Sequence, residues 1–418
     1  MRHLHACRLA AVTSIAALIA LTSGPAIAEI TLSPPSEAGF TAEGVQALTT
    51  EMQGLIDQKK LAGAVTLLAR GGKVVHFEAY GVQDVETGEP TRRDTIYRIA
   101  SMTKPVTGVA MMILWEEGLW SLDDPVAKYI PEFADLEVRL KGGGTEPQSQ
   151  PMTMRQLMSH TAGFDVSAGY ETAGLQDGDL QAMISKLAAM PLAVQPGSDW
   201  RYGPSVNIQG YLVEKLSGQS LDQFFKTRLF DPLGMADTGF YVDAGKLNRV
   251  SAVHTFGPDG LIAPAGQVRP APTSPPVFLS GSGGLFSTAE DYWRFAQMLA
   301  NGGVLEGARI LKPETVELMR TNVLADGITV DLYGPSQKGV GFGLDFAVIM
   351  DPVAAGTPQG LNAFYWGGAF GTWFWIDPTH DLVFVGMIQN LRGSIPGAGT
   401  PPLRDISPRL VYEALSPD

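Results

Sequence analysis

Cysteine is almost absent from this 418-residue chain, whose single thiol is Cys7. A chain without a cysteine pair forms no internal disulfide, so its stability has to come from the burial of a large core. Histidine is also scarce, with six residues and no His-x-x-x-His pair, so the sequence gives no sign of a metallohydrolase. We expect no metal and no cofactor, and we interpret His160 as a buried hydrogen-bonding residue.

Three further features are missing, and each excludes a class of protein. Lys and Arg number 30 against 43 Asp and Glu, and a net charge of −13 argues against nucleic acid as a partner. The apolar run at residues 9–21 is shorter than the roughly 20 residues that span a bilayer, so no stable membrane anchor is expected. No serine has glycine two positions away on both sides, which excludes the nucleophile motif of α/β-hydrolases.

The first residues have the pattern of an export signal. Arg2 and Arg8 precede the apolar run, and the small-residue triplet at residues 26–28 follows it. This order is typical of a secretory signal peptide, which we expect to be cleaved after Ala28. The sequence therefore predicts a periplasmic or secreted protein.

The segment after the signal peptide predicts a helix followed by a β-hairpin. Apolar residues recur at helical spacing over residues 41–60. Two β-rich runs follow at residues 64–69 and 74–80, and Gly71-Gly72 between them tolerates the positive φ of a tight turn.

Residues 122–262 show mostly helical patterns, including the capping box that Thr153 begins. Helix and strand return near the C-terminus, with expected strands at 361–366, 371–376 and 382–389 and a final helix at 403–415. We predict an α/β (α+β) sandwich, with an antiparallel sheet flanked by helices, built from residues 29–121 and 263–418. An all-α region, residues 122–262, is inserted, and the whole forms one interwoven catalytic domain.

One Ser-x-x-Lys motif occurs in the chain, at Ser101-Met102-Thr103-Lys104. Pro105 is tolerated only near a helix start, so Ser101 should lie where the apolar helix 106–115 begins. Residues three apart on a helix are neighbours, which places Lys104 beside the Ser101 hydroxyl. A weak hydroxyl nucleophile needs such a base within hydrogen-bond reach.

Two more elements follow in a familiar order. They are Trp200-Arg201-Tyr202-Gly203-Pro204-Ser205 and Trp366-Gly367-Gly368-Ala369, and supporting segments lie at residues 157–163, 231–235 and 281–287. With the Ser-x-x-Lys motif, this ordered set resembles the β-lactamase-related serine hydrolases of the class C β-lactamase and penicillin-binding-protein type. In motif the chain is most similar to the family VIII carboxylesterases. The resemblance covers nearly all of the chain after the signal peptide and implies a β-lactamase/transpeptidase-like fold.

The resemblance also implies roles for individual residues. Ser101 is the nucleophile, Lys104 and Tyr202 form the proton-transfer pair, and either could be the base. We favour a coupled pair in which Lys104 lowers the pKa of Tyr202. The backbone amides of Ser101 and Ala369 would form the oxyanion hole, and the substrate would be bound by Trp366, Gly367 and Gly368. Without the resemblance, the glycines would indicate a bulge or tight bend and the tryptophan a packing residue.

Two departures from the β-lactamase pattern bear on the substrate. Pro204 stands where an asparagine helps to bind the antibiotic side chain, and Ser205 or Asn207 are the nearby residues that could substitute. Trp366 replaces the lysine that attracts the antibiotic carboxylate, which turns an anion contact into an apolar wall. Both changes favour a neutral ester over a β-lactam.

The sequence therefore predicts an exported serine hydrolase that acts through a Ser101 acyl-enzyme, first of all a carboxylesterase on small esters. The partner is a small-molecule ester or amide. The alternatives are a peptidase or amidase for D-amino-acid or short peptides, a β-lactamase, and an acyltransferase. A binding protein that keeps the fold without turnover is the non-enzyme alternative, although Ser101, Lys104 and Tyr202 are all present.

Overall fold

Two glycines shape the first β-hairpin of the chain. Gly71 and Gly72 adopt φ values of +54° and +77° and connect β1 (Gly63–Arg70) to β2 (Lys73–Gly81). This left-handed backbone is open to glycine at little cost, so the hairpin forms where the sequence predicts it. The computed structural model describes residues 30–165, 173–257, 260–264, 266, 268–332 and 336–417, and the predicted signal peptide lies outside them. Residues from Thr31 onward form one unit.

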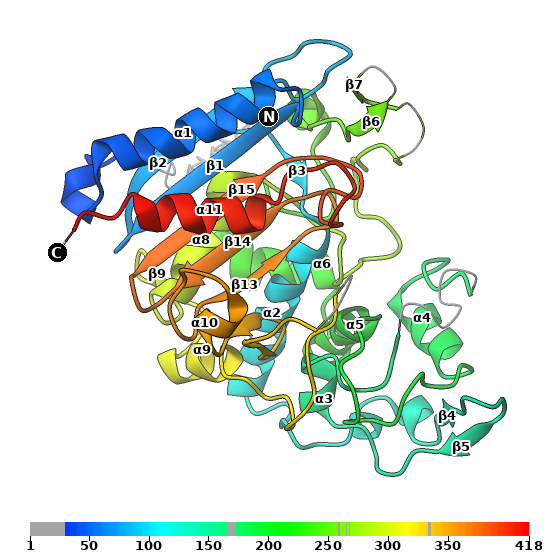
Figure 1. The fold of residues 1–418 in the computed structure, drawn as a ribbon. Coiled ribbons are helices and arrows are strands. Elements are labelled where there is room, and N and C mark those ends of the chain that lie inside the picture. Colours follow the sequence, from blue (N-terminus) through cyan, green and yellow to red (C-terminus); the bar gives the residue numbers. More distant parts are fainter. Residues whose placement is uncertain are drawn as a thin grey trace, which may run out of the picture. The chain divides into compact units, whose positions relative to one another are not determined.

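A seven-stranded sheet forms the centre of this unit, in the order β11-β12-β13-β14-β15-β1-β2 (Figure 1). Every pair of neighbours is antiparallel, as expected. The strands other than β1 and β2 are β11 (Val340–Phe342), β12 (Ala347–Ile349), β13 (Phe364–Gly367), β14 (Trp373–Asp377) and β15 (Leu382–Met387). The sequence predicted β13, β14 and β15 but not β11 and β12, because three residues are too few for an alternation to be recognised.

Helices cover both faces of the sheet. Helices α1 (Ala42–Asp57) and α11 (Leu403–Glu413) pack on one face, and α8 (Ala289–Ala300) packs against β1, β14 and β15 on the other (Figure 1). Side chains alternate along a strand, so Trp373 and Trp375 of β14 join the core under α1 and α11. Phe374 between them points the other way and meets Tyr292 of α8 at 5.0 Å between ring centroids.

A second group of helices surrounds α2 (Thr103–Glu116), whose residues from Thr103 to Leu114 are all buried. Helix α5 (Ser205–Ser217) packs along α2. The predicted capping box is present, since the Thr153 and Gln156 side chains each bond the other's backbone amide. The other helices of this part are α3 (Met154–Met158), α4 (Leu180–Leu187), α6 (Leu221–Phe225) and α7 (Asp231–Leu233).

The remaining elements are short. Two-stranded ribbons join β3 (Tyr97–Arg98) to β8 (Phe286–Ser287), β4 (Glu137–Arg139) to β5 (Thr145–Pro147), β6 (Thr255–Gly257) to β7 (Gly260–Ile262), and β9 (Val304–Leu305) to β10 (Ala308–Arg309). Two further helices are α9 (Pro313–Met319) and α10 (Pro352–Ala355). Within the described residues, no helix combines the length and apolarity needed to cross a bilayer.

Candidate active site

Ser101 lies in a 3₁₀ turn, Ala100–Met102, that leads directly into α2. Pro105 occupies the first turn of that helix, as the sequence predicts, where its missing amide hydrogen costs nothing. Ala100 has a φ of +44°, which a residue with a Cβ adopts at a cost of about 1 kcal/mol. The backbone immediately before the Ser101 hydroxyl is therefore strained, a condition that is common at functional sites.

Lys104 reaches back from α2 to the serine. Its Nζ lies 3.2 Å from Ser101 Oγ and donates a hydrogen bond of 2.7 Å to the Ser282 carbonyl oxygen. The same nitrogen stands 4.6 Å from the centre of the Tyr202 ring. The lysine is only 4 % exposed. The structure thus brings together the three side chains that the sequence singled out for proton transfer and nucleophilic attack.

The directions of the pKa shifts separate the two candidate bases. Burial lowers the pKa of Lys104 to about 7, against an opposing contribution from the Asp345 carboxyl group. Burial raises the pKa of Tyr202 above its usual value, and the neighbouring Ser101 and Trp366 side chains offset this only in part. The pKa of Tyr202 therefore moves in the opposite direction to the one we expected, because its loss of hydration outweighs the lowering by the Ser101, Trp366 and Arg404 side chains. Lys104 is the group that can be neutral near pH 7.

The end of β13 lies across the turn that carries Ser101. A Cβ on Gly368 would come within 2.3 Å of the Ile99 carbonyl oxygen, and a Cβ on Gly367 within 2.1 Å of Arg404 Nη2. Gly368 is thus required by the packing of the backbone, whereas a side chain at Gly367 would displace the end of the flexible Arg404 side chain. In the described part of the chain, the backbone amides of Ser101 and Ala369 donate no hydrogen bond. The oxyanion-hole role of these two amides stays a prediction.

Aromatic rings form one side of the site. Trp366 lies 5.7 Å from Tyr202 and 5.5 Å from Phe342 between ring centroids, and it is 5 % exposed. Trp366 is therefore a buried core residue that also lies beside Tyr202 in the site. His160 is fully buried, 4.9 Å from the Tyr202 ring, but neither ring nitrogen has a hydrogen-bond partner among the described residues. The burial expected for His160 is present, and its expected hydrogen bond is not.

Asn207 has a structural role that the sequence did not reveal. Its Oδ1 accepts hydrogen bonds from Ser280 Oγ at 3.0 Å and from the Ser282 amide at 2.9 Å. Since the Ser282 carbonyl oxygen accepts from Lys104, Asn207 fixes the loop that orients the lysine. This oxygen is therefore already engaged within the protein. Ser205, the other candidate substitute, is buried with no partner for its hydroxyl among the described residues.

A cavity of about 380 Å³ lies beside the turn that follows β13. Gly371, Ile395, Pro401 and Arg404 are among its lining residues, and Arg404 Nη2 donates a hydrogen bond of 3.3 Å to the Gly368 carbonyl oxygen. The cavity therefore adjoins the strand end that carries Ala369. Over the described residues, no group of three His, Cys, Asp or Glu side chains is placed to hold a metal ion.

Asp345, in the loop between β11 and β12, is a further acidic residue near the site that the sequence did not suggest, and burial raises its pKa well above the usual range. Its carboxyl group acts electrostatically on both Lys104 and Tyr202. No local motif marks it, because the contact depends on a loop more than 200 residues away from α2 in the chain.

The sequence model of the family described as Beta-lactamase matches residues 46–401. An uncharacterized protein of Mycobacterium tuberculosis is 35 % identical over 83 % of this chain and 90 % of its own. Esterase EstB of Burkholderia gladioli is 33 % identical over 86 % of this chain and 95 % of its own.

Among solved structures, EstCE1, described as a hydrolase with promiscuous acyltransferase activity, is similar with a TM-score of 0.74 and 28 % identity. The match covers 90 % of this chain and 98 % of EstCE1. Together with the antiparallel sheet and its flanking helices, it confirms the predicted β-lactamase/transpeptidase-like fold.

Proposed function

This chain belongs to the beta-lactamase family of serine hydrolases, and from that membership we propose that it is an exported carboxylesterase that hydrolyses small esters through a Ser101 acyl-enzyme. The observation that carries the proposal is the contact between Ser101 Oγ and Lys104 Nζ at 3.2 Å. A buried lysine with a pKa of about 7 is largely neutral at slightly alkaline pH, so it can accept the serine proton.

In the acylation step, Ser101 Oγ attacks the ester carbonyl carbon and its proton passes to Lys104 Nζ. The carbonyl oxygen becomes an oxyanion, and the backbone amides of Ser101 and Ala369 donate hydrogen bonds to it. As the tetrahedral intermediate collapses, the bond to the alcohol oxygen breaks and Lys104 returns the proton to the leaving alcohol. The acyl group remains on Ser101.

In the deacylation step, a water molecule attacks the acyl carbon and gives its proton to Lys104. The carbon–Oγ bond then breaks, Ser101 recovers its proton, and the carboxylic acid leaves. If an alcohol takes the place of water, the same sequence transfers the acyl group. Acyl transfer is therefore the second candidate function, and the activity named for EstCE1 favours it.

The residues around Ser101 support an ester over a β-lactam. Trp366 and Tyr202 form an apolar wall that packs on the buried Phe342 ring, and no lysine stands at position 366 to attract a carboxylate. Asn207 Oδ1 is engaged with the Ser280 and Ser282 loop and does not face a substrate amide as a free acceptor. Esterase EstB, a relative over most of the chain, points to the same class of reaction.

We also propose that the chain is exported. Arg2, Arg8 and the apolar run before Ala28 support a cleaved signal peptide, a segment that lies outside the described residues. Expression in a Gram-negative host followed by N-terminal sequencing tests this directly. A mature chain that begins at Glu29 supports export, and a chain that keeps its first residues in the cytoplasm refutes it.

A substrate panel tests the reaction itself. p-Nitrophenyl esters of a range of acyl lengths should be turned over most efficiently, D-alanyl peptides less efficiently, and nitrocefin least. Ser101→Ala should abolish ester turnover and labelling by a fluorophosphonate probe. Ser185→Ala, which changes an exposed serine of α4, is the matched control and should leave both unchanged. Faster turnover of nitrocefin or peptide than of every ester would contradict the carboxylesterase proposal.

A further inference from the structure

Asp345 is a buried carboxyl group with an unusual backbone. It is 1 % exposed and has a φ of +64°, in the left-handed region that favours glycine. The Gln209 side chain donates a hydrogen bond of 3.2 Å to Oδ1, and the Asp345 amide donates one of 3.0 Å to the Met158 carbonyl oxygen. Oδ2 has no partner among the described residues. Burying a carboxyl group with an unsatisfied oxygen costs stability, and such a cost is typical of a functional position.

The carboxyl group of Asp345 lies against α2, one turn beyond Lys104. A Cβ on Gly108 would stand 2.8 Å from Asp345 Oδ2, so the absence of a side chain at Gly108 provides the space for the carboxyl group. Gly108 follows Lys104 by four residues and therefore shares its helix face. The packing of this loop thus directs a carboxyl group towards the face of α2 that carries the proposed base.

We propose that Asp345 is a positioning residue for the Ser101–Lys104 pair, whose buried carboxyl group stabilises the ammonium form of Lys104 that arises when the serine gives up its proton. The inference rests on the proposed function of that pair. Asp345 touches no reacting atom and acts through Lys104 alone. Burial raises the pKa of Asp345 well above its usual range, and Lys104 offsets part of that rise, so the carboxyl group gives up its proton most readily when Lys104 is in its ammonium form. A carboxylate that faces a lysine in a poorly hydrated site strengthens the lysine's hold on a proton, so Asp345 offsets part of the effect of burial on the pKa of Lys104.

The other groups that face Lys104 do not supply this charge. Burial and the lysine itself lower the pKa of His160 to about 3, so the imidazole is neutral at physiological pH. Burial raises the pKa of Tyr202, so the phenol also stays neutral. The Ser282 group in contact with Lys104 is a backbone carbonyl. Among the described residues, Asp345 is therefore the acidic side chain that raises the pKa of Lys104.

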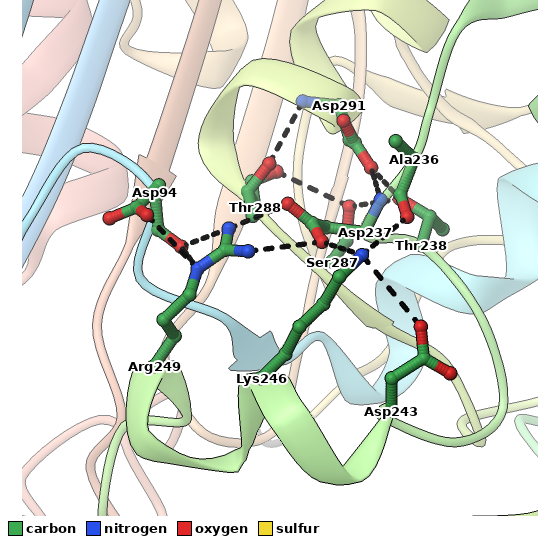
Figure 2. Close-up of polar contacts among 10 residues, drawn as sticks. All are labelled: Asp94, Ala236, Asp237, Thr238, Asp243, Lys246, Arg249, Ser287, Thr288 and Asp291. Carbon is green, nitrogen blue, oxygen red and sulfur yellow. Dashed lines mark hydrogen bonds and ion pairs between the residues drawn. The ribbon is translucent and has the colours of Figure 1, made fainter. Parts of the chain in front are cut away.

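A second buried carboxyl group provides a matched control. Figure 2 shows Asp291 at the start of α8, facing the segment that contains Asp237 and Thr238. Its Oδ2 accepts a hydrogen bond of 2.7 Å from the Asp237 amide and one of 2.8 Å from Thr238 Oγ1. Burial raises the pKa of Asp291 to about 7. Asp291 thus shares the burial of Asp345, but it joins a loop to a helix and has no contact with Lys104.

The experiment measures the second-order rate constant of fluorophosphonate labelling of the full chain between pH 5 and 10. Labelling of Ser101 requires a neutral base but no knowledge of the natural ester. In Asp345→Asn the acidic limb of the profile should move to lower pH by about one unit, and the plateau rate should fall by about tenfold. Asp345→Gly suits the left-handed backbone and removes the same charge, so it should move the limb in the same direction. Asp291→Asn should lower the melting temperature and leave the limb where it is.

An acidic limb that stays at the same pH in both Asp345 variants overturns the proposal, even if their rates fall. A limb that also moves in Asp291→Asn overturns it too, because the shift would then follow from loss of any buried carboxyl group. If the labelling profile shifts as expected but no ester is turned over, the carboxylesterase function fails and the role of Asp345 stands.

Discussion

Lys104→Met should make the protein more stable while removing its activity. Burial lowers the pKa of Lys104 from 10.5 to about 7, which corresponds to about 5 kcal/mol of lost stability at pH 7. Methionine has a similar length and no charge, so it relieves this cost. It also leaves the Ser282 carbonyl oxygen without its hydrogen bond, at a cost of about 1–3 kcal/mol. We expect a net gain of about 2 kcal/mol in the free energy of unfolding at pH 7.

The gain should depend on pH in a definite direction. Between pH 7 and 10.5 the unfolded chain binds a proton at Lys104 that the folded chain does not, so the stability of the wild-type protein rises with pH. The advantage of Lys104→Met should therefore shrink by about 1.4 kcal/mol per pH unit over that window. Urea denaturation at pH 7 and pH 10 measures it.

The matched control is Lys60→Met, which makes the same change at an exposed position and should alter stability by about 0.5 kcal/mol or less. Ester hydrolysis by Lys104→Met should fall by about 10³-fold. A Lys104→Met protein that is less stable than the wild type at pH 7, or whose stability difference is the same at pH 7 and 10, would refute the assignment of a buried neutral lysine.

Three further predictions concern the backbone around Ser101 and the loop that holds Lys104. Gly368→Ala places a methyl group 2.3 Å from the Ile99 carbonyl oxygen, so the strand end must move and kcat should fall by about 10²-fold, as measured with p-nitrophenyl acetate. Ala100→Gly relieves the left-handed strain at φ +44° and should raise the free energy of unfolding by about 1 kcal/mol, as measured by urea denaturation. Asn207→Ala leaves the Ser282 amide unpaired and so loosens the residue whose carbonyl oxygen accepts the hydrogen bond of Lys104. Since Trp366 and Tyr202 are unchanged, kcat should fall about tenfold with little change in KM.

Much of the fold was predictable because its signals are local. The alternation of apolar residues indicated β13, β14 and β15, and the Gly71-Gly72 pair marked the first hairpin. Strands β11 and β12 left no such pattern, since each has three residues and gains its partners only from the assembled sheet. An alternation with a period of two residues cannot be recognised in an element of only three residues.

The residues of the site likewise fall into those that local sequence indicated and those that it did not. Ser101 and Lys104 were predicted from their spacing and Pro105, and the structure places their side chains in contact. Tyr202 was found only through its resemblance to a family motif, and the direction of its pKa shift depends on burial that a sequence does not reveal. Asn207 and Asp345 reach Lys104 from distant parts of the chain, so no local spacing indicated what they do.

The direct test of the central claim is the position of the acyl group. Rapid acid quenching of the enzyme during turnover of a p-nitrophenyl ester, followed by peptide mass spectrometry, should place one acyl group on Ser101. Lys104→Met should show no such adduct on the same timescale. An acyl group on any other residue, or steady ester turnover by Ser101→Ala, would contradict the account.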